Sequence, residues 1–96
     1  MQSIQQLSHF LNSIPDDPRL GPYHISLYMS LYHHWLLNGC MDQFHIQRES
    51  IMQMAKISGI ATYHKCIKEL DEYGYIKYRP SYNPAGTTKV VMNCMF

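Results

Sequence analysis

The chain has 96 residues, which is enough for one domain and too short for a second hydrophobic core. Apolar residues make up 46% of the sequence and charged residues 16%, a composition that favours a compact core and argues against disorder. The formal net charge is only +1, so bulk charge does not indicate a nucleic-acid partner. The charge is unevenly distributed, because residues 1–42 carry one base and three acids whereas residues 43–96 carry seven bases and four acids. We therefore expect any anionic partner to contact the C-terminal half.

The three cysteines, Cys40, Cys66 and Cys94, are odd in number and widely spaced, and no CxxC pair occurs. This pattern argues against a disulfide framework and a zinc site, and it is typical of a protein of the reducing cytoplasm. The N-terminal "MQSIQQLSHF" lacks the basic start and apolar run of a secretory signal. No apolar stretch approaches the roughly 20 residues that a membrane-spanning helix needs. We therefore expect a cytoplasmic protein with no membrane partner.

The N-terminal half predicts two helices separated by a connector. Residues 3–14 are amphipathic, and their apolar stripe contains Ile4, Leu7, Phe10, Leu11 and Ile14. The prolines and glycine of "PDDPRLGP" predict a connector at 16–22. A second helix is predicted over residues 24–38. Leu27 and Leu31 lie beside its main apolar stripe, which predicts that this helix is buried on two sides.

The C-terminal half begins with a predicted strand at 43–46. A third helix is expected to start at Arg48 or Glu49 and to face inward through Ile51, Met54 and Ala55. The dipeptide Ser58-Gly59 predicts a tight turn into a fourth helix at 60–73. Gly74 is expected to end that helix.

A hairpin is predicted over residues 75–95. Its first strand alternates, with Ile76 and Tyr78 on one face and Lys77 and Arg79 on the other. The segment "NPAGTT" predicts the connecting loop. The inward face of the closing strand is expected to contain Val90, Met92 and Cys94.

The expected order of elements is therefore H-H-β-H-H-β-β, a mainly α chain with a small β-hairpin (α+β). Two short helices joined by a tight turn and followed by a hairpin are the pattern of a winged helix-turn-helix. We expect a single domain over residues 1–96. It consists of an extra N-terminal helix at 1–15, the connector at 16–22 and a winged-helix core at 23–96.

The fourth helix predicts two different faces. Residues three and four positions apart share a helix face, so the inward stripe is expected to contain Tyr63, Cys66, Ile67 and Leu70. The opposite stripe then contains Ala61, His64, Lys65 and Lys68. These small, hydrogen-bonding and cationic side chains lie toward the N-terminal half of the helix. That half enters the DNA major groove in a helix-turn-helix, whereas the acids Glu69, Asp71 and Glu72 would lie further from DNA.

The segment "ISGIATYHKCIKELDEYGYIKY" resembles the recognition helix and first wing strand of bacterial winged-helix regulators, through Thr62, Tyr63, Ile67, Leu70 and Gly74-Tyr75-Ile76. More narrowly, "DPRLGPYHISLYMSLYHHW", "TYHKCIKEL" and "YGYIKYRPSYNP" resemble small winged-helix transcriptional regulators encoded on bacterial mobile elements, over roughly residues 16–92. The resemblance implies binding to double-stranded DNA but no particular operator. The turn "SGIA" departs from the wider family because it lacks a Ser/Thr-Lys/Arg start. Base contacts from Ile60 and Ala61 would be apolar, for instance to a thymine methyl group.

The candidate DNA-contacting residues come from three places. Arg48 begins the third helix, where this motif often contacts phosphate, and Lys77, Arg79 and Lys89 flank the predicted wing. The full candidate set is Arg48, Ala61, Thr62, His64, Lys65, Lys68, Lys77, Arg79 and Lys89.

Other classes of site find little support in the sequence. No helical i, i+4 histidine pair or HExxH motif is present, so we expect no metal. No Ser-His-Asp or Cys-His set, phosphate-binding glycine loop or carboxylate pair indicates an enzyme. No cofactor or small-molecule ligand is evident either.

Two alternatives remain open at this point. The chain is expected to be a DNA-binding transcriptional regulator, but a protein–protein adaptor that uses the winged-helix fold in a replication or transfer complex fits its modest net charge. The adaptor is favoured if Glu69, Asp71 and Glu72 neutralise the lysine stripe. The N-terminal helix either covers the core or pairs with a second copy, and a homodimer is preferred because two-fold proteins match pseudo-palindromic sites.

Overall fold

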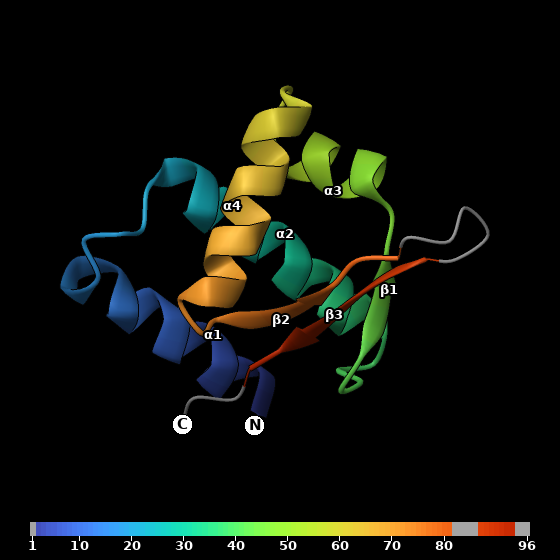
Figure 1. Cartoon of the computed structure of the whole chain (residues 1–96). Helices are drawn as coiled ribbons and strands as arrows, with labels where there is room; N and C mark the ends of the chain where they lie inside the picture. Colours follow the sequence, from blue (N-terminus) through green and yellow to red (C-terminus); the bar gives the residue numbers. More distant parts are fainter. Residues whose placement is uncertain (1, 82–86, 94–96) are drawn as a thin grey trace.

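The computed structural model describes residues 2–81 and 87–93. Its elements follow the predicted order, with one short 3₁₀ helix added between the first helix and the connector (Figure 1). They are α1 (Gln2–Ser13), η1 (Ile14–Asp16), α2 (Pro22–Leu37), β1 (Phe44–Ile46), α3 (Arg48–Ala55), α4 (Ile60–Glu72), β2 (Ile76–Arg79) and β3 (Thr88–Met92). The predicted α+β class is confirmed, with four α-helices and one three-stranded antiparallel sheet in the described part of the chain.

The sheet has the strand order β1-β3-β2, so the last strand lies in the centre. Tyr78 on β2 and Phe44 on β1 both lie opposite Val90, which is fully buried. This register places the predicted apolar face of the hairpin against the helices. Residues 82–86 and 94–96, which include the predicted wing tip and Cys94, lie outside the described residues.

Helix α2 is the centre of the core. In Figure 1 it lies behind α4, with α1 at the lower left and the sheet at the lower right. Leu27 and Leu31 are fully buried, and Tyr28 and Trp35 are nearly so. The predicted burial of α2 on two sides is therefore confirmed. Gly39 follows its C-terminus with a φ of +71°, the left-handed conformation that commonly ends a helix.

The predicted apolar stripe of α1 is only partly right. Phe10 is buried and stacks on Tyr28 with ring centroids 3.6 Å apart, but Ile4 and Leu11 are 62% and 46% exposed. Gln6 is buried instead, since its amide nitrogen donates hydrogen bonds to the Tyr28 hydroxyl at 2.7 Å and to a backbone carbonyl at 2.9 Å. The core-facing line of α1 therefore runs through Gln6 and Phe10, and the aliphatic residues flank it.

Helix α3 also differs from the prediction at one position. Ile51 and Ala55, four residues apart, are buried as expected, whereas Met54 is 48% exposed. This eight-residue helix packs on α2 along the line of Ile51, whose carbonyl oxygen accepts a hydrogen bond from Ser30 at 3.3 Å. Met54 lies beside that line and faces outward.

Helix α4 and its junction with the hairpin agree with the prediction. The four expected inward residues, Tyr63, Cys66, Ile67 and Leu70, are all buried. Gly59 is the N-cap residue, and Gly74 follows the C-terminus with a φ of +88°. Glycine adopts this backbone conformation without the steric cost that a Cβ atom brings. Gly74 thus lets the chain turn directly from α4 into β2.

Candidate nucleic-acid interface

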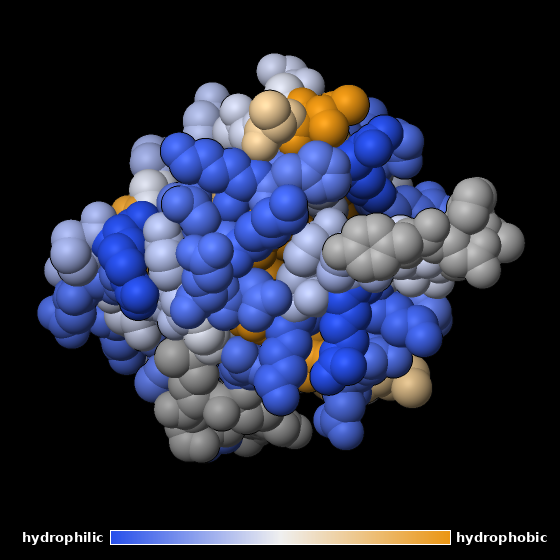
Figure 2. Space-filling model, in the orientation of Figure 1, coloured by the Kyte–Doolittle hydropathy of each residue, from blue (hydrophilic) through white to orange (hydrophobic). Residues whose placement is uncertain are grey.

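The outer face of α4 carries the predicted polar and cationic side chains. Ala61, Lys65 and Lys68 are exposed, and Thr62 and His64 are half-buried. Figure 2 shows that the face of the molecule over α4 is mostly hydrophilic, with a small hydrophobic patch over the N-terminal end of this helix. The first turn of α4 contains no acidic residue. The helix therefore presents a continuous surface without negative charge toward its N-terminal half.

A groove of about 320 Å³ lies between α4, the start of α3 and the sheet. Arg48, His64 and Lys68 line it on the helix side, and Tyr78, Ser81 and Thr88 line it on the hairpin side. No carboxylate lines this groove within the described chain. Cationic groups that converge with hydroxyl groups are the usual partners of phosphate oxygens.

Two details define the chemistry of the groove. Tyr63 also lines the groove, and burial raises the pKa of its hydroxyl, which therefore stays neutral. The guanidinium of Arg48 contacts the exposed Glu49 carboxylate at 3.4 Å, the upper end of hydrogen-bond length. An exposed pair of this length contributes little free energy, so an anion in the groove can compete for Arg48.

The basic residues of the hairpin lie on a different surface. Lys77 and Arg79 are exposed on β2 and alternate with Ile76 and Tyr78, so they point to the opposite sheet face from the α4 groove. Lys89 on β3 lies directly opposite Arg79 in the register. The structure thus brings Arg48, His64 and Lys68 together but places the three hairpin bases on the outer face of the sheet.

The register adds His45 to this outer face, a residue that the sequence did not suggest. His45 on β1 lies opposite Lys89 on β3, which lies opposite Arg79 on β2. Three cationic or titratable side chains therefore follow one another across the sheet. Like charges directly opposite each other on neighbouring strands are destabilising, which makes this face a suitable surface for an anion.

The acids of α4 form no direct ion pair with its lysines in the described part of the chain, although the charge of Lys65 is one of the smaller causes of the lowered pKa of Glu69. The Glu69 carboxylate accepts hydrogen bonds from His24 at 3.0 Å and Tyr73 at 3.2 Å, and the Asp71 carboxylate accepts one from the Tyr78 backbone at 3.3 Å. Within residues 2–81 and 87–93, neither Lys65 nor Lys68 forms an ion pair. The condition that favours the adaptor alternative is therefore not met by direct ion pairing.

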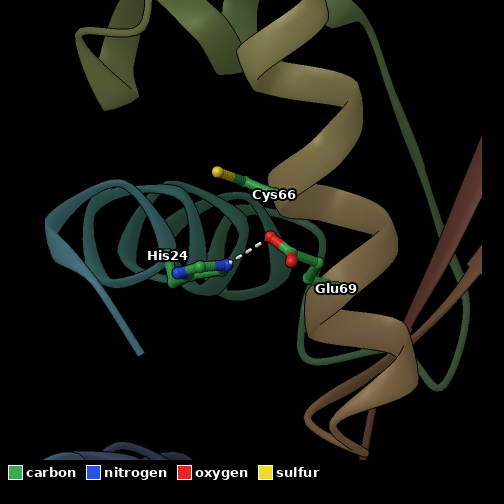
Figure 3. Close-up of side chains that lie close together, drawn as sticks. All are labelled: His24, Cys66 and Glu69. Atoms are coloured by element: carbon green, nitrogen blue, oxygen red, sulfur yellow. Dashed lines mark hydrogen bonds and ion pairs between the residues drawn. The ribbon is translucent and has the colours of Figure 1, made fainter. Parts of the chain in front are cut away.

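One buried cluster offers metal-binding atoms away from this surface. His24 at the start of α2 and the α4 residues Cys66 and Glu69 bring their ligand atoms within 4.8 Å of one another (Figure 3). Imidazole, thiolate and carboxylate are all zinc ligands. Cys66 is a thiol whose pKa is raised by burial, and the hydrogen bond from His24 lowers the pKa of the Glu69 carboxyl.

The hydrogen bonds of His24 argue against a metal at this cluster. The backbone N–H of Gly21 donates to His24 Nδ1 at 2.9 Å, so the ring proton is assigned to Nε2, which donates to Glu69. A metal at Nε2 would displace that proton to Nδ1, where it would meet the Gly21 N–H. Metal-bound histidines instead direct their second nitrogen at an acceptor. The cluster is better explained as a structural link between the start of α2 and α4.

These observations define a small α+β domain with a basic groove beside an exposed helix and a second basic face on its sheet. No helix in the described part of the chain is both long and apolar enough to cross a membrane. Comparison with protein-family models, with curated proteins and with solved structures finds no match to this chain.

Proposed function

We propose that this chain is a cytoplasmic winged helix-turn-helix protein that binds double-stranded DNA and regulates transcription. The observation that carries the proposal is the groove lined by Arg48, His64 and Lys68, whose lining includes no carboxylate among the described residues. The order of the elements and the central position of β3 support it further. In this proposal helix 60–73 enters the major groove, and hairpin 75–95 is the wing.

The two basic surfaces have separate roles in the proposed complex. His64, Lys65 and Lys68 contact the phosphates beside the major groove, because α4 presents them on one face. Arg48 joins them from the start of α3. Lys77, Arg79 and Lys89 point away from α4, so they contact a different stretch of backbone from the other side of the hairpin. The wing thereby lies between two phosphate chains. The role is one of binding, and the proposal assigns no catalytic residue.

A salt titration on duplexes of random sequence tests this function. Each phosphate that the protein neutralises lowers the logarithm of the binding constant by about 0.9 per tenfold increase in salt. We expect measurable binding at low salt and a slope that corresponds to several phosphates. Binding that is undetectable at low salt, or independent of salt, would contradict the proposal. Selection of bound duplexes from a random pool then gives any sequence preference and the half-site spacing.

The second candidate function is a protein–protein adaptor, and the exposed apolar residues favour it. Four apolar side chains are between 46% and 70% exposed: Ile4 and Leu11 on α1, Leu37 at the end of α2, and Met41 in the segment that follows it. The same α1 residues are the proposed contact of a homodimer, since Gln6 and Phe10 already attach the other side of α1 to the core. Sedimentation of the wild type and an Ile4→Gln/Leu11→Gln variant tests this contact. A wild type that is monomeric at high concentration contradicts the homodimer.

A further inference from the structure

The first turn of α4 is apolar where the proposed interface would contact bases. Ile60, the first residue of the helix, is 50% exposed, and Ala61 is exposed beside it. The small hydrophobic patch at the top of Figure 2 lies over this end of α4. An aliphatic side chain left half in water on an otherwise hydrophilic face is a candidate contact surface.

Polar groups for reading bases are scarce at the same place. Gly59, the N-cap residue, has no side chain, and no side-chain hydrogen bond caps the helix. Thr62 is half-buried. The first turn therefore offers methyl and methylene groups where a recognition helix often carries amide or guanidinium groups.

The apolar turn is continuous with the cationic surface. Ile60 lies one helical turn before His64, a residue of the basic groove. It also lines a shallow cavity with Arg48 and Gln53, and the Glu49 carboxylate that pairs with Arg48 lies at the same cavity. An occupant of this surface must therefore combine negative charge with an exposed apolar group a few ångströms away. Duplex DNA supplies both, because the thymine C5-methyl group projects into the major groove between the phosphate chains.

We propose that Ile60 and Ala61 contact thymine methyl groups in the major groove, so that the protein selects sites with A·T pairs beneath the start of α4. The inference rests on the proposed DNA-binding function and names the base feature that it recognises. Sequence selection then comes from apolar contact, whereas the groove cations supply affinity that is independent of sequence.

A chemical double-mutant cycle isolates this contact. The wild type and Ile60→Ala are titrated with two DNA duplexes, one of alternating A·T pairs and one in which deoxyuridine replaces every thymidine. The two duplexes differ only in the C5-methyl group. A Leu37→Ala variant is the matched control, because Leu37 is a 70% exposed aliphatic residue on α2. For the wild type we expect tighter binding to thymine than to uracil, by about four-fold per contacted methyl group. Ile60→Ala should lose most of this ratio, and Leu37→Ala should retain it.

The outcomes separate this inference from the function on which it rests. If no duplex binds at low salt, the DNA-binding proposal itself fails. If both duplexes bind equally well to the wild type, DNA binding stands and the thymine contact is overturned. A ratio that survives in Ile60→Ala overturns the role of Ile60. A second arm uses alternating G·C duplexes with and without 5-methylcytosine, and tighter binding to the methylated duplex supports recognition of the methyl group itself.

Discussion

The Tyr75 hydroxyl donates a hydrogen bond of 2.6 Å to the Asp17 carboxylate, 58 positions away in the sequence. The same carboxylate accepts two hydrogen bonds from the Arg19 guanidinium, at 2.8 and 2.9 Å, and that guanidinium lies 4.2 Å above the centre of the Tyr73 ring. The connector thus contacts the residues on both sides of Gly74. It holds the junction between α4 and the hairpin, which fixes the angle between the two proposed DNA-contacting elements.

Replacing Tyr75 by Phe should destabilise the fold by about 1–2 kcal/mol at neutral pH, since it removes a hydrogen bond to a charged acceptor. The hydrogen bonds from Arg19 and Tyr75 hold the pKa of the Asp17 carboxyl well below its usual range. A carboxyl whose pKa is lower in the folded state stabilises the fold above its unfolded pKa, and this stability is lost as the pH falls. Urea unfolding between about pH 5 and about pH 2 should therefore show a smaller loss for Tyr75→Phe than for the wild type. Equal losses of unfolding free energy in the two proteins would show that the Tyr75 contact does not lower the pKa of Asp17.

Neutralising the α4 lysines should weaken DNA binding without unfolding the chain. Lys65 and Lys68 are exposed and form no ion pair with a described residue, so Lys65→Ala/Lys68→Ala should change the free energy of unfolding by less than about 0.5 kcal/mol. If each lysine neutralises one phosphate, the slope of log binding constant against log salt should fall by about 1.8. The charge-conserving Lys65→Arg/Lys68→Arg variant should keep the wild-type slope. If the salt slope of DNA binding does not change in the alanine variant, these lysines contact solvent and not phosphate.

The outer face of the sheet should act independently of α4. Lys77→Ala/Arg79→Ala should lower the salt slope by a further amount of similar size, and its effect should add to that of the α4 variant because the two sets lie on different surfaces. Removing Arg79 also relieves the like-charge contact with Lys89, so the single Arg79→Thr variant should be more stable by a few tenths of a kcal/mol. Binding and urea unfolding of the same variants measure both effects. A loss of binding with no change in slope would mean that these residues do not contact phosphate.

The sequence predicts best where a periodic pattern alone decides burial. The four inward residues of α4 are correct because their spacing places them on one helix face, and Gly74 is correct because few residues suit that backbone conformation. The α1 stripe is partly wrong because the burial of Gln6 depends on the Tyr28 hydroxyl and on the carbonyl of Asn93, 87 positions away. No helical period contains that information.

The candidate site shows the same limit. Alternation correctly puts Lys77 and Arg79 on one face of a strand, but it does not say on which side of the sheet α4 lies. No sequence pattern predicts the position of His45, because only the antiparallel register through β3 places it in line with Lys89 and Arg79. The separation of the basic residues into a groove and an outer face is therefore a property of the tertiary structure.

Cobalt binding tests the assignment of His24, Cys66 and Glu69 as a structural cluster. In a Cys40→Ser/Cys94→Ser variant, Cys66 is the sole thiol, so a thiolate-to-cobalt charge-transfer band would report on this cluster alone. We expect no band, because the ring proton of His24 lies on the nitrogen that faces Glu69. A band that disappears when His24 is also replaced by alanine would instead establish a metal site. The His24→Ala change alone should cost about 2 kcal/mol of stability, because it removes both the hydrogen bond to the Glu69 carboxylate and the one from Gly21.

At Gly74 there is space for a side chain, but the backbone conformation disfavours one. A Cβ atom built at this position would meet nothing within 4 Å, yet the φ of +88° is strained for any L-residue. Gly74→Ala should therefore destabilise the chain by about 1–2 kcal/mol, or relax by re-aiming the hairpin relative to α4. Gly74→Asn is the matched control, because asparagine adopts a positive φ more readily than alanine does. Thermal unfolding separates the two variants. Equal melting temperatures would show that the backbone at Gly74 relaxes freely. If the salt slope of DNA binding falls only in Gly74→Ala, then both α4 and the hairpin contact phosphate only when the angle between them is kept.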